Sequence, residues 1–245
     1  MNTILEHIVN KSRSIAILLD PDKLNIDHLP KLCSKIDASP ASFIFVGGSM
    51  VQNEITHKIV RKIKTFCSLP IILFPGNINQ LTDEADALLF LSLLSGTNPE
   101  YLNGQHIKAA PLLQTMNLEV IPTSYILVDG GNLSSTLRVS QTNPIQAEDL
   151  DRIKNTCLAG QYMGKQLTYL EAGSGAENPI ATNTISEIRK VLNHPLIVGG
   201  GLRNMDQINK AFDAGANLVV VGTAFEEDPH FFEASTLSNQ VYGNH

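Results

Sequence analysis

The stretch SFIFVGGSMVQNEITHKIVRKIKTFCSLPIILF, residues 42–74, predicts the repeating unit of the fold. It begins and ends with short apolar runs, at 42–48 and 70–74. Between them an apolar stripe recurs at helical spacing. The stripe consists of Val51, Ile55, Ile59, Ile63 and Phe66. Because both runs are apolar throughout rather than alternating, they are typical of parallel strands buried on both faces. The stretch therefore predicts a strand, an amphipathic helix and a second, parallel strand.

Similar apolar runs occur along the rest of the chain. They span residues 14–20, 87–91, 119–128, 167–173, 195–200 and 217–222. Together with the first two, they make eight strands, most of them separated by stretches with helical spacing. Eight strand and helix units predict an α/β fold of the (β/α)8 TIM barrel type. A doubly wound open sheet is the alternative. The 245 residues suit one domain, residues 1–245, because single barrels of this length are common.

Two connections differ from the usual barrel pattern. The segment PGNINQLTDEAD, residues 75–86, has room for only about two helical turns and contains Pro75 and Gly76. It predicts that the third outer helix is reduced or missing. The polar stretch at 130–144 is too long for a minimal turn after a strand. This stretch is either a functional loop that could close as a lid or a tolerated surface insertion.

Charge and cysteine content exclude several classes of function. The chain carries 18 basic and 24 acidic residues, a net charge of -6, which argues against a nucleic-acid partner. The three cysteines have no CxxC spacing, so neither a zinc site nor a disulfide framework is indicated. The chain offers no signal-peptide core and no apolar run long enough to span a bilayer. We expect a soluble cytoplasmic protein, and a peripheral contact with a membrane surface stays open.

Glycine-rich segments follow three consecutive strands of the predicted barrel. They read EAGSG at 171–175, VGGGLRN at 198–204 and VVGTAF at 220–225. Glycines allow backbone N–H groups to converge on an anion, and TIM barrels commonly bind phosphate with the loops after their last two strands. The segments therefore predict a phosphate site, although glycines that only make tight turns would give the same pattern. Glu171 lies at the edge of the first segment, as a single acid beside an exposed backbone loop.

An acid also closes the first predicted strand. The motif LLDPDK, residues 18–23, places Asp20 at the mouth of the barrel, because Pro21 stops the strand. A carboxylate that faces a phosphate pocket needs a cation, and Mg²⁺ takes one or two carboxylates together with phosphate oxygens. Alternatively, Asp20 caps the helix that follows. Ser49 in the motif VGGSM could add an oxygen ligand or cap the helix that begins near Met50.

Seven motifs together resemble the geranylgeranylglyceryl phosphate synthases and their bacterial relatives. They are LLDPDK, FVGGSM, LFPGN, NPEYLNGQHIKAA, YLEAGSG, VGGGLR and VVVGTAFE. These enzymes of phospholipid biosynthesis join a prenyl diphosphate to sn-glycerol 1-phosphate. The resemblance extends from Asp20 to about Glu226. The glycine loops occur in many phosphate-binding barrels, and the combination of LFPG with YLEAGSG is more specific.

The resemblance implies a role for each matching position. Asp20 and Ser49 match the family's magnesium positions, and Glu171 matches its catalytic carboxylate. Tyr169 lies two residues earlier on the same face of the strand, so it can help to orient the glycerol. The expected contacts with glycerol phosphate come from Tyr169, Leu170, Glu171, Ala172, Gly173, Ser174, Gly175, Gly200, Gly201, Gly222 and Thr223.

The resemblance also implies what else the molecule binds. Leu18 stands where some bacterial relatives carry a lysine, so the chain is similar to the archaeal-type group that has bacterial members. Geranylgeranyl is the default prenyl group, and the gap after Phe74 is where its channel could open. Members of this group are often dimers or hexamers, so we expect a homo-oligomer.

Two alternatives to a prenyltransferase stay open. A phosphosugar isomerase or lyase could use Asp20 and Asp129 as acid and base. A non-catalytic protein could bind a phosphate ligand and use Glu171 only to fix its orientation.

Overall fold

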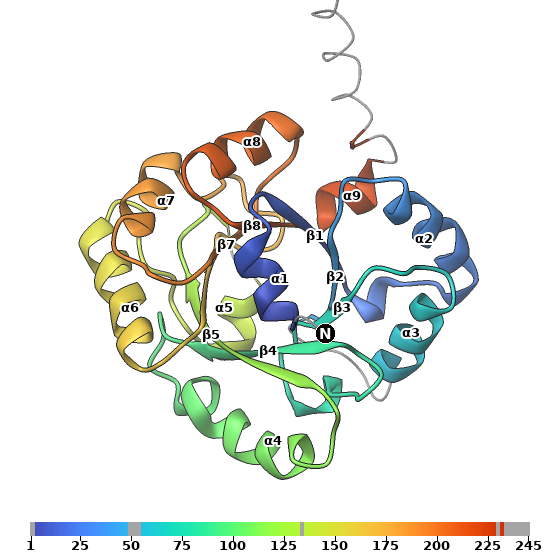
Figure 1. The fold of residues 1–245 in the computed structure, drawn as a ribbon. Helices are drawn as coiled ribbons and strands as arrows, with labels where there is room; N and C mark the ends of the chain where they lie inside the picture. Colours follow the sequence, from blue (N-terminus) through green and yellow to red (C-terminus); the bar gives the residue numbers. More distant parts are fainter. Residues whose placement is uncertain (1–2, 49–54, 133–134, 229–230, 233–245) are drawn as a thin grey trace, which may run out of the picture.

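The computed structural model describes residues 3–48, 55–132, 135–228 and 231–232. Eight parallel strands close into a barrel in the order of the sequence (Figure 1). The strands are β1 Ser14–Leu19, β2 Phe43–Val46, β3 Ile71–Leu73, β4 Ala87–Leu93, β5 Glu119–Leu127, β6 Leu167–Glu171, β7 Leu196–Gly199 and β8 Leu218–Val221. Because β1 pairs with both β2 and β8, the sheet has no free edge. The predicted TIM barrel is confirmed, and the open sheet is excluded.

Helices surround the barrel. They are α1 Ile4–Asn10, α2 Leu29–Asp37, α3 Ile55–Lys64, α4 Gln105–Leu113, α5 Ser135–Ser140, α6 Leu150–Tyr162, α7 Thr182–Arg189, α8 Met205–Asp213 and α9 Thr223–Glu227. A π-helical turn, η4 Glu100–Gly104, leads into α4, and 3-10 turns η1 Pro21–Lys23 and η2 Ile26–His28 precede α2. Within the described residues, none of the helices is long and apolar enough to cross a lipid bilayer.

The third outer helix is missing, as the sequence predicts. Between β3 and β4 the chain forms only the 3-10 turn η3 Ile78–Gln80. The Gln80 side chain accepts a hydrogen bond from the Gly48 amide (3.1 Å) and donates one to the Gly48 carbonyl (2.7 Å). It thus satisfies both backbone groups of Gly48 next to the end of β2. In Figure 1 the chain leaves β3 and reaches β4 without a helix between α3 and α4.

Alternate residues along each strand pack in two separate apolar layers. Ala16, Phe45 and Tyr169 belong to the layer inside the barrel, whereas Ile17 and Leu170 belong to the layer between barrel and helices. This alternation follows from the two-residue period of a strand. It directs the next residues of the inner series, Asp20 after β1 and Glu171 in β6, toward the carboxyl end of the barrel.

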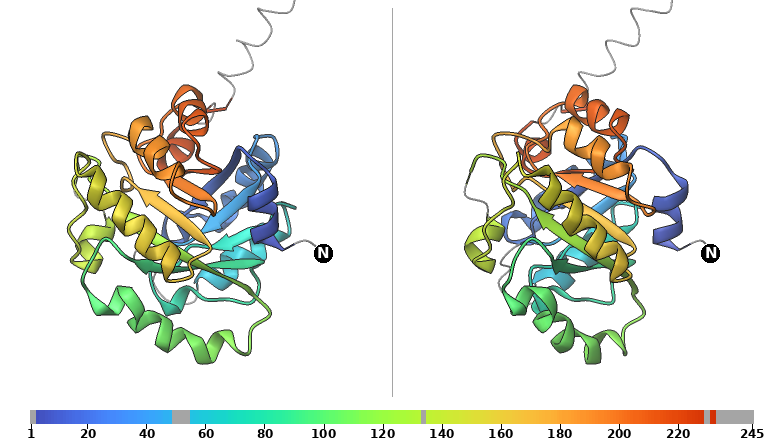
Figure 2. Two further views of the ribbon diagram at one scale, coloured as in Figure 1. Left: turned by 60° about the vertical axis from the view of Figure 1, so that its left-hand side comes forward. Right: turned by 90° about the vertical axis from the view of Figure 1, so that its left-hand side faces the viewer.

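Helix α1 covers the amino end of the barrel. Ile8 is fully buried in the inner layer, and the His7 ring lies edge-on to Phe43 at 5.0 Å. The Glu119 carboxylate, at the start of β5, accepts hydrogen bonds from the amides of Ile4 (2.6 Å) and Leu5 (3.0 Å). Figure 2 shows α1 on one side of the barrel, apart from the outer ring. The open end of the barrel is therefore the carboxyl end.

The polar stretch at 130–144 carries a short helix, α5. Val128 and Ile145 pair as an isolated parallel bridge, which closes the stretch at its base. Asn98, which follows β4, donates a hydrogen bond from its side chain to the Ser140 carbonyl at 2.9 Å. The described part of this stretch is therefore built into the carboxyl end of the barrel.

Replacement of Glu119 tests the attachment of α1. Glu119→Ala removes the acceptor of two helix amides, so we expect the free energy of unfolding to fall by about 1–2 kcal/mol. Urea denaturation followed by circular dichroism measures this change. Glu148→Ala, at an exposed position before α6, is the matched control. Equal stability of the two variants would contradict the capping role of Glu119.

Candidate active site

A polar cavity of about 1030 Å³ opens at the carboxyl end of the barrel. Its volume matches the upper range of small-molecule sites, roughly 300–1,000 Å³. Most residues that the sequence assigns to the site line this cavity. They are Asp20, Tyr169, Glu171, Ser174, Gly175, Gly200, Gly201, Gly222 and Thr223. The structure therefore brings together residues from four strands that lie far apart in the sequence.

Four other assigned residues are placed differently. The side chains of Leu170 and Ala172 pack in the layer between barrel and helices, because they belong to the outward-facing series of β6. A ligand in the cavity could meet either residue only through its backbone. Gly173 donates its amide to the Glu171 carboxylate instead of lining the cavity. Ser49 lies outside the described residues.

Glu171 is the buried acid of the cavity. It is only 6% exposed, and its Oε1 accepts a hydrogen bond from the Gly173 amide at 2.7 Å. Burial raises the pKa of the Glu171 carboxyl, and the Gly173 amide and the nearby Tyr169 hydroxyl offset only part of this rise. Gly200 leaves room for this carboxylate, since a Cβ atom there would lie 2.6 Å from Oε1. A carboxylate in these surroundings is a stronger base than an exposed one.

Tyr169 presents a polar group without a protein partner. Its ring stacks on Phe74 at 5.3 Å and meets Tyr125 edge-on at 5.4 Å. The hydroxyl is buried beside Glu171, yet nothing in the described chain completes a hydrogen bond of normal geometry with it. Buried polar groups are nearly always paired, so an unpaired one at a cavity wall favours a ligand there.

Three glycine loops line the polar cavity beside Glu171. Gly175, Gly200 and Gly201 have positive φ angles of 69°, 85° and 70°, which side chains other than glycine rarely adopt. The Ser174 and Thr223 hydroxyls lie 3.4 Å apart and join the loops after β6 and β8. The amides of Ser174 and Gly175 donate to no acceptor in the described chain. Such converging N–H groups can bind an anion.

Asp20 lies at the mouth of the same cavity. Its Oδ1 accepts a hydrogen bond from the Asp22 amide at 3.2 Å, so Asp20 does cap the turn that follows β1. Lys23 Nζ is 3.9 Å from the other carboxylate oxygen. Burial raises the pKa of the Asp20 carboxyl against the opposing effects of the Asp22 amide and Lys23. The carboxylate also lies against the Gly48 backbone, because a Cβ atom there would be only 2.9 Å from Oδ1.

The surroundings of Asp20 could hold a magnesium ion that takes only some of its ligands from the protein. No group of three or more His, Cys, Asp or Glu residues is gathered anywhere in the described chain. Mg²⁺ suits such a site, because it is usually bound by one or two carboxylates, substrate phosphates and water. Asp20 would supply the carboxylate.

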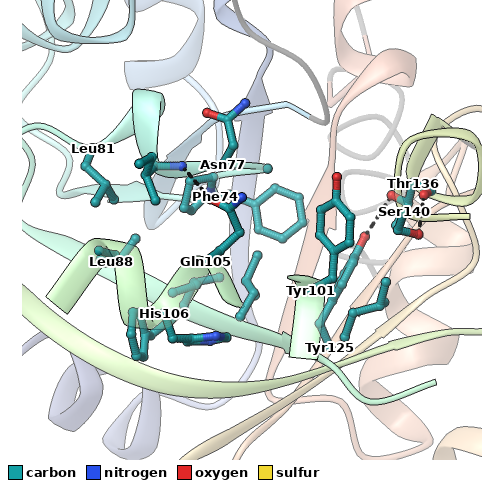
Figure 3. Close-up of a pocket in the computed structure, with 18 of the residues that line it drawn as sticks. Phe74, Asn77, Leu81, Leu88, Tyr101, Gln105, His106, Tyr125, Thr136 and Ser140 are labelled. Atoms are coloured by element: carbon teal, nitrogen blue, oxygen red, sulfur yellow. Dashed lines mark hydrogen bonds between the residues drawn. The ribbon is translucent and has the colours of Figure 1, made fainter. Parts of the chain in front are cut away.

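A second, apolar pocket lies where the third outer helix is missing. Its walls include Phe74, Leu81, Leu88, Leu91 and Ala109. In Figure 3 Leu81, Leu88 and His106 lie toward one end, Thr136 and Ser140 toward the other, and Phe74 between them. The short connection at 75–86 was the only signal of this pocket in the sequence.

The two cavities adjoin. Gly48, Phe74, Tyr125, Thr136 and Val139 line both of them. Helix α5 forms part of this shared wall, and Tyr125 and Thr136 are linked by a contact of 3.5 Å between their hydroxyls. A molecule with a polar end and an apolar tail could therefore occupy both cavities at once.

Basic side chains at the polar cavity were not singled out from the sequence. Arg138 of α5 and Arg203 after β7 line it together with Lys23. Arg203 is part of the motif VGGGLR, where its position two residues after three glycines was an available signal. Because Asp20, Glu171 and Asp228 line the same cavity, its charge is mixed, with basic and acidic side chains side by side.

Comparison with known proteins gives a consistent result. Residues 7–238 match the model of the PcrB family. The chain is 50% identical to a geranylgeranylglyceryl phosphate synthase from Zunongwangia profunda over 92% of this chain and 98% of that protein. It is 48% identical to the protein of the same name from Flavobacterium johnsoniae, over 94% and 95% of the two chains.

A solved structure shares the architecture closely. It is the crystal structure of (S)-3-O-geranylgeranylglyceryl phosphate synthase from Thermoplasma acidophilum in complex with its substrate sn-glycerol-1-phosphate. The two chains superimpose with a TM-score of 0.89 at 31% sequence identity, over 96% of each chain.

The buried carboxylate predicts a pH-dependent stability. The pKa of the Glu171 carboxyl in the folded protein lies above its usual 4.5. The folded protein therefore loses stability as the pH rises from 4.5 through this raised pKa. Glu171→Gln removes this loss, so we expect a higher melting temperature than that of the wild type at about pH 7 and a smaller difference at about pH 4. Glu148→Gln is the exposed control. A variant that is less stable than the wild type at neutral pH would contradict the argument.

Proposed function

The chain belongs to the PcrB family, and from this membership we propose that it is a geranylgeranylglyceryl phosphate synthase. It joins the prenyl group of geranylgeranyl diphosphate to sn-glycerol 1-phosphate and releases diphosphate. The observation that carries the proposal is the junction of a polar and an apolar cavity beside a buried acid, Glu171. The polar cavity suits glycerol phosphate and the diphosphate group, and the apolar pocket suits the prenyl chain.

The alternatives explain less of the structure. A phosphosugar isomerase or lyase would have no use for the apolar pocket next to Phe74. Its second proposed acid, Asp129, does not line the polar cavity and instead accepts a hydrogen bond from the Gly131 amide at 2.9 Å. A binding protein without catalysis would not need a buried carboxylate at the cavity wall, because its burial carries a cost in stability.

The glycine loops and Glu171 bind the two ends of glycerol phosphate. The phosphate is held by the amides of Ser174 and Gly175, with the hydroxyls of Ser174 and Thr223 close by. The glycerol then extends toward Glu171 and Tyr169. The carboxylate accepts a hydrogen bond from the attacking hydroxyl, and the Tyr169 hydroxyl gains the partner that the protein does not supply.

The reaction forms one carbon–oxygen bond and breaks another. The glycerol hydroxyl oxygen bonds to C1 of the prenyl group, while the bond from C1 to the diphosphate oxygen breaks and its electron pair leaves with the diphosphate. The hydroxyl proton passes to the Glu171 carboxylate, whose raised pKa favours this transfer. A prenyl diphosphate that lies along the shared wall at Phe74 and Tyr125 would bring C1 next to the hydroxyl, and such positioning can supply much of the rate.

Asp20 is the residue we assign to magnesium, together with Ser49 on the basis of the family resemblance. When bound, Mg²⁺ would neutralise charge on the departing diphosphate. Lys23 and Arg138, which line the same cavity, add positive charge near it.

We also expect a dimer or hexamer in the cytoplasm. Helices α4 and α6 expose the large apolar side chains of Ile107, Tyr162 and Met163, which are 69%, 82% and 65% accessible. Contact with another subunit or with a membrane surface would cover them.

The activity assay uses labelled sn-glycerol 1-phosphate, geranylgeranyl diphosphate and magnesium, and follows label that becomes extractable into butanol. We expect EDTA to abolish the product and the enantiomer sn-glycerol 3-phosphate to react poorly. Glu171→Gln should lower kcat by about 10²–10⁴, the usual contribution of a general base. No extractable product from the wild type with any prenyl diphosphate would overturn the proposal.

The apolar pocket predicts a change in chain-length preference. Ala109 is buried and lines the pocket, whereas its neighbour Ala110 is exposed and does not. Ala109→Phe fills the pocket, so the ratio of kcat/KM for geranylgeranyl to that for farnesyl diphosphate should fall by about tenfold or more. Ala110→Phe introduces the same side chain outside and should leave the ratio unchanged. An unchanged ratio in both variants would show that the prenyl chain binds elsewhere.

A further inference from the structure

The loop after β6, residues 172–176, is enclosed by two neighbouring loops at very short range. On one side is Gly130, where a Cβ atom would lie 2.4 Å from the Ala172 carbonyl oxygen and 2.7 Å from the Ala176 side chain. On the other side is Gly200, where a Cβ atom would lie 2.7 Å from the Gly173 amide nitrogen. Only glycine permits such close approach. The loop at 172–176 is therefore packed between the segments that follow β5 and β7.

Each neighbouring loop also supplies one side chain that binds a carbonyl of this loop. Asn132 Nδ2 donates to the Gly175 carbonyl at 2.8 Å, and Arg203 Nη2 donates to the Ala176 carbonyl at 3.1 Å. The Ala176 amide in turn donates to the Gly173 carbonyl at 3.1 Å. Both ends of the peptide between Gly175 and Ala176 are thus bonded. Because a peptide group is planar, these bonds fix its orientation.

The loop needs such bonds, since its own residues do not hold it in one shape. Gly173 and Gly175 have φ angles of 106° and 69°, and glycine has more conformational freedom to lose than any other residue. A loop that already has its bound shape loses less entropy when the ligand binds. The amides of Ser174 and Gly175, which donate to nothing in the described chain, would then meet the phosphate already in position.

One atom of the Asn132 side chain lowers the stability of the folded protein. Its Oδ1 is buried and has no hydrogen-bond partner in the described chain. An unpaired buried acceptor is unfavourable for folding. The favourable contribution of this side chain therefore comes from its Nδ2 group, which donates a hydrogen bond to the Gly175 carbonyl.

We infer that Asn132 and Arg203 are positioning residues that set the loop at 172–176 for the phosphate of the glycerol substrate, an inference that rests on the proposed function. Arg203 also lines the polar cavity, so its charge would attract the phosphate directly. Asn132 is neutral and acts on the phosphate through the shape of the loop. It is therefore the cleaner residue to replace.

The test compares Asn132→Leu with the wild type and with Asn155→Leu, the same exchange at an exposed position of α6. Calorimetric titrations measure the Kd for sn-glycerol 1-phosphate and for inorganic phosphate without any prenyl diphosphate. We expect Asn132→Leu to raise both Kd values by about 3- to 10-fold, the effect of one lost hydrogen bond. KM for glycerol phosphate should rise equally, while kcat and KM for geranylgeranyl diphosphate stay as in Asn155→Leu. Asn132→Gln keeps the amide donor and should recover most of the affinity.

The outcomes separate the two proposals. Equal phosphate affinity in the wild type and Asn132→Leu would overturn the positioning role and leave the transferase intact. A fall in kcat with unchanged affinity would also overturn it, because the loop would then act on the reaction step. A wild-type chain that binds neither ligand would overturn the transferase proposal together with this inference.

Discussion

The hydrogen bond from the Gly173 amide to the Glu171 carboxylate joins the two halves of the polar site. The strand before it carries the acid and Tyr169, and the loop after it carries the amides of Ser174 and Gly175, which donate to no acceptor in the described chain. Because the donor and acceptor are only two residues apart, the backbone itself nearly fixes the distance from the Glu171 carboxylate to this loop. The close packing of Gly200 against both groups adds to this constraint.

The apolar half of the site arises from an omission in the fold. A regular barrel would cover β3 and β4 with a helix, whereas here η3 and the Gln80 side chain satisfy the backbone of Gly48 with far less bulk. The space that is left lies directly beside the carboxyl ends of the strands, so the two cavities meet without a separate channel. The same short segment thereby satisfies the Gly48 backbone and leaves the apolar pocket open.

The sequence predicts the barrel and the polar site well, because apolar strands, glycine loops and acids at strand ends are local signals. The directions of Leu170 and Ala172 could also have been predicted, since they alternate with Tyr169 and Glu171 along one strand. Helix α5 and the capping of α1 by Glu119 had no local signal. The walls of the apolar pocket come from β4, η4, α4 and α5, and their meeting depends on the packing of the whole ring.

The wall shared by the two cavities also bears on how turnover ends. In the proposed reaction glycerol phosphate occupies only the polar cavity, whereas the prenyl diphosphate and the product are amphiphiles that each occupy both cavities. Two weak attachments within one molecule act together. While one end is bound, the released end stays close to its own cavity at a high effective concentration and rebinds. Departure of the product would therefore be slower than that of glycerol phosphate. Helix α5 contributes Thr136 and Val139 to both cavities, so its displacement would open both ends at once.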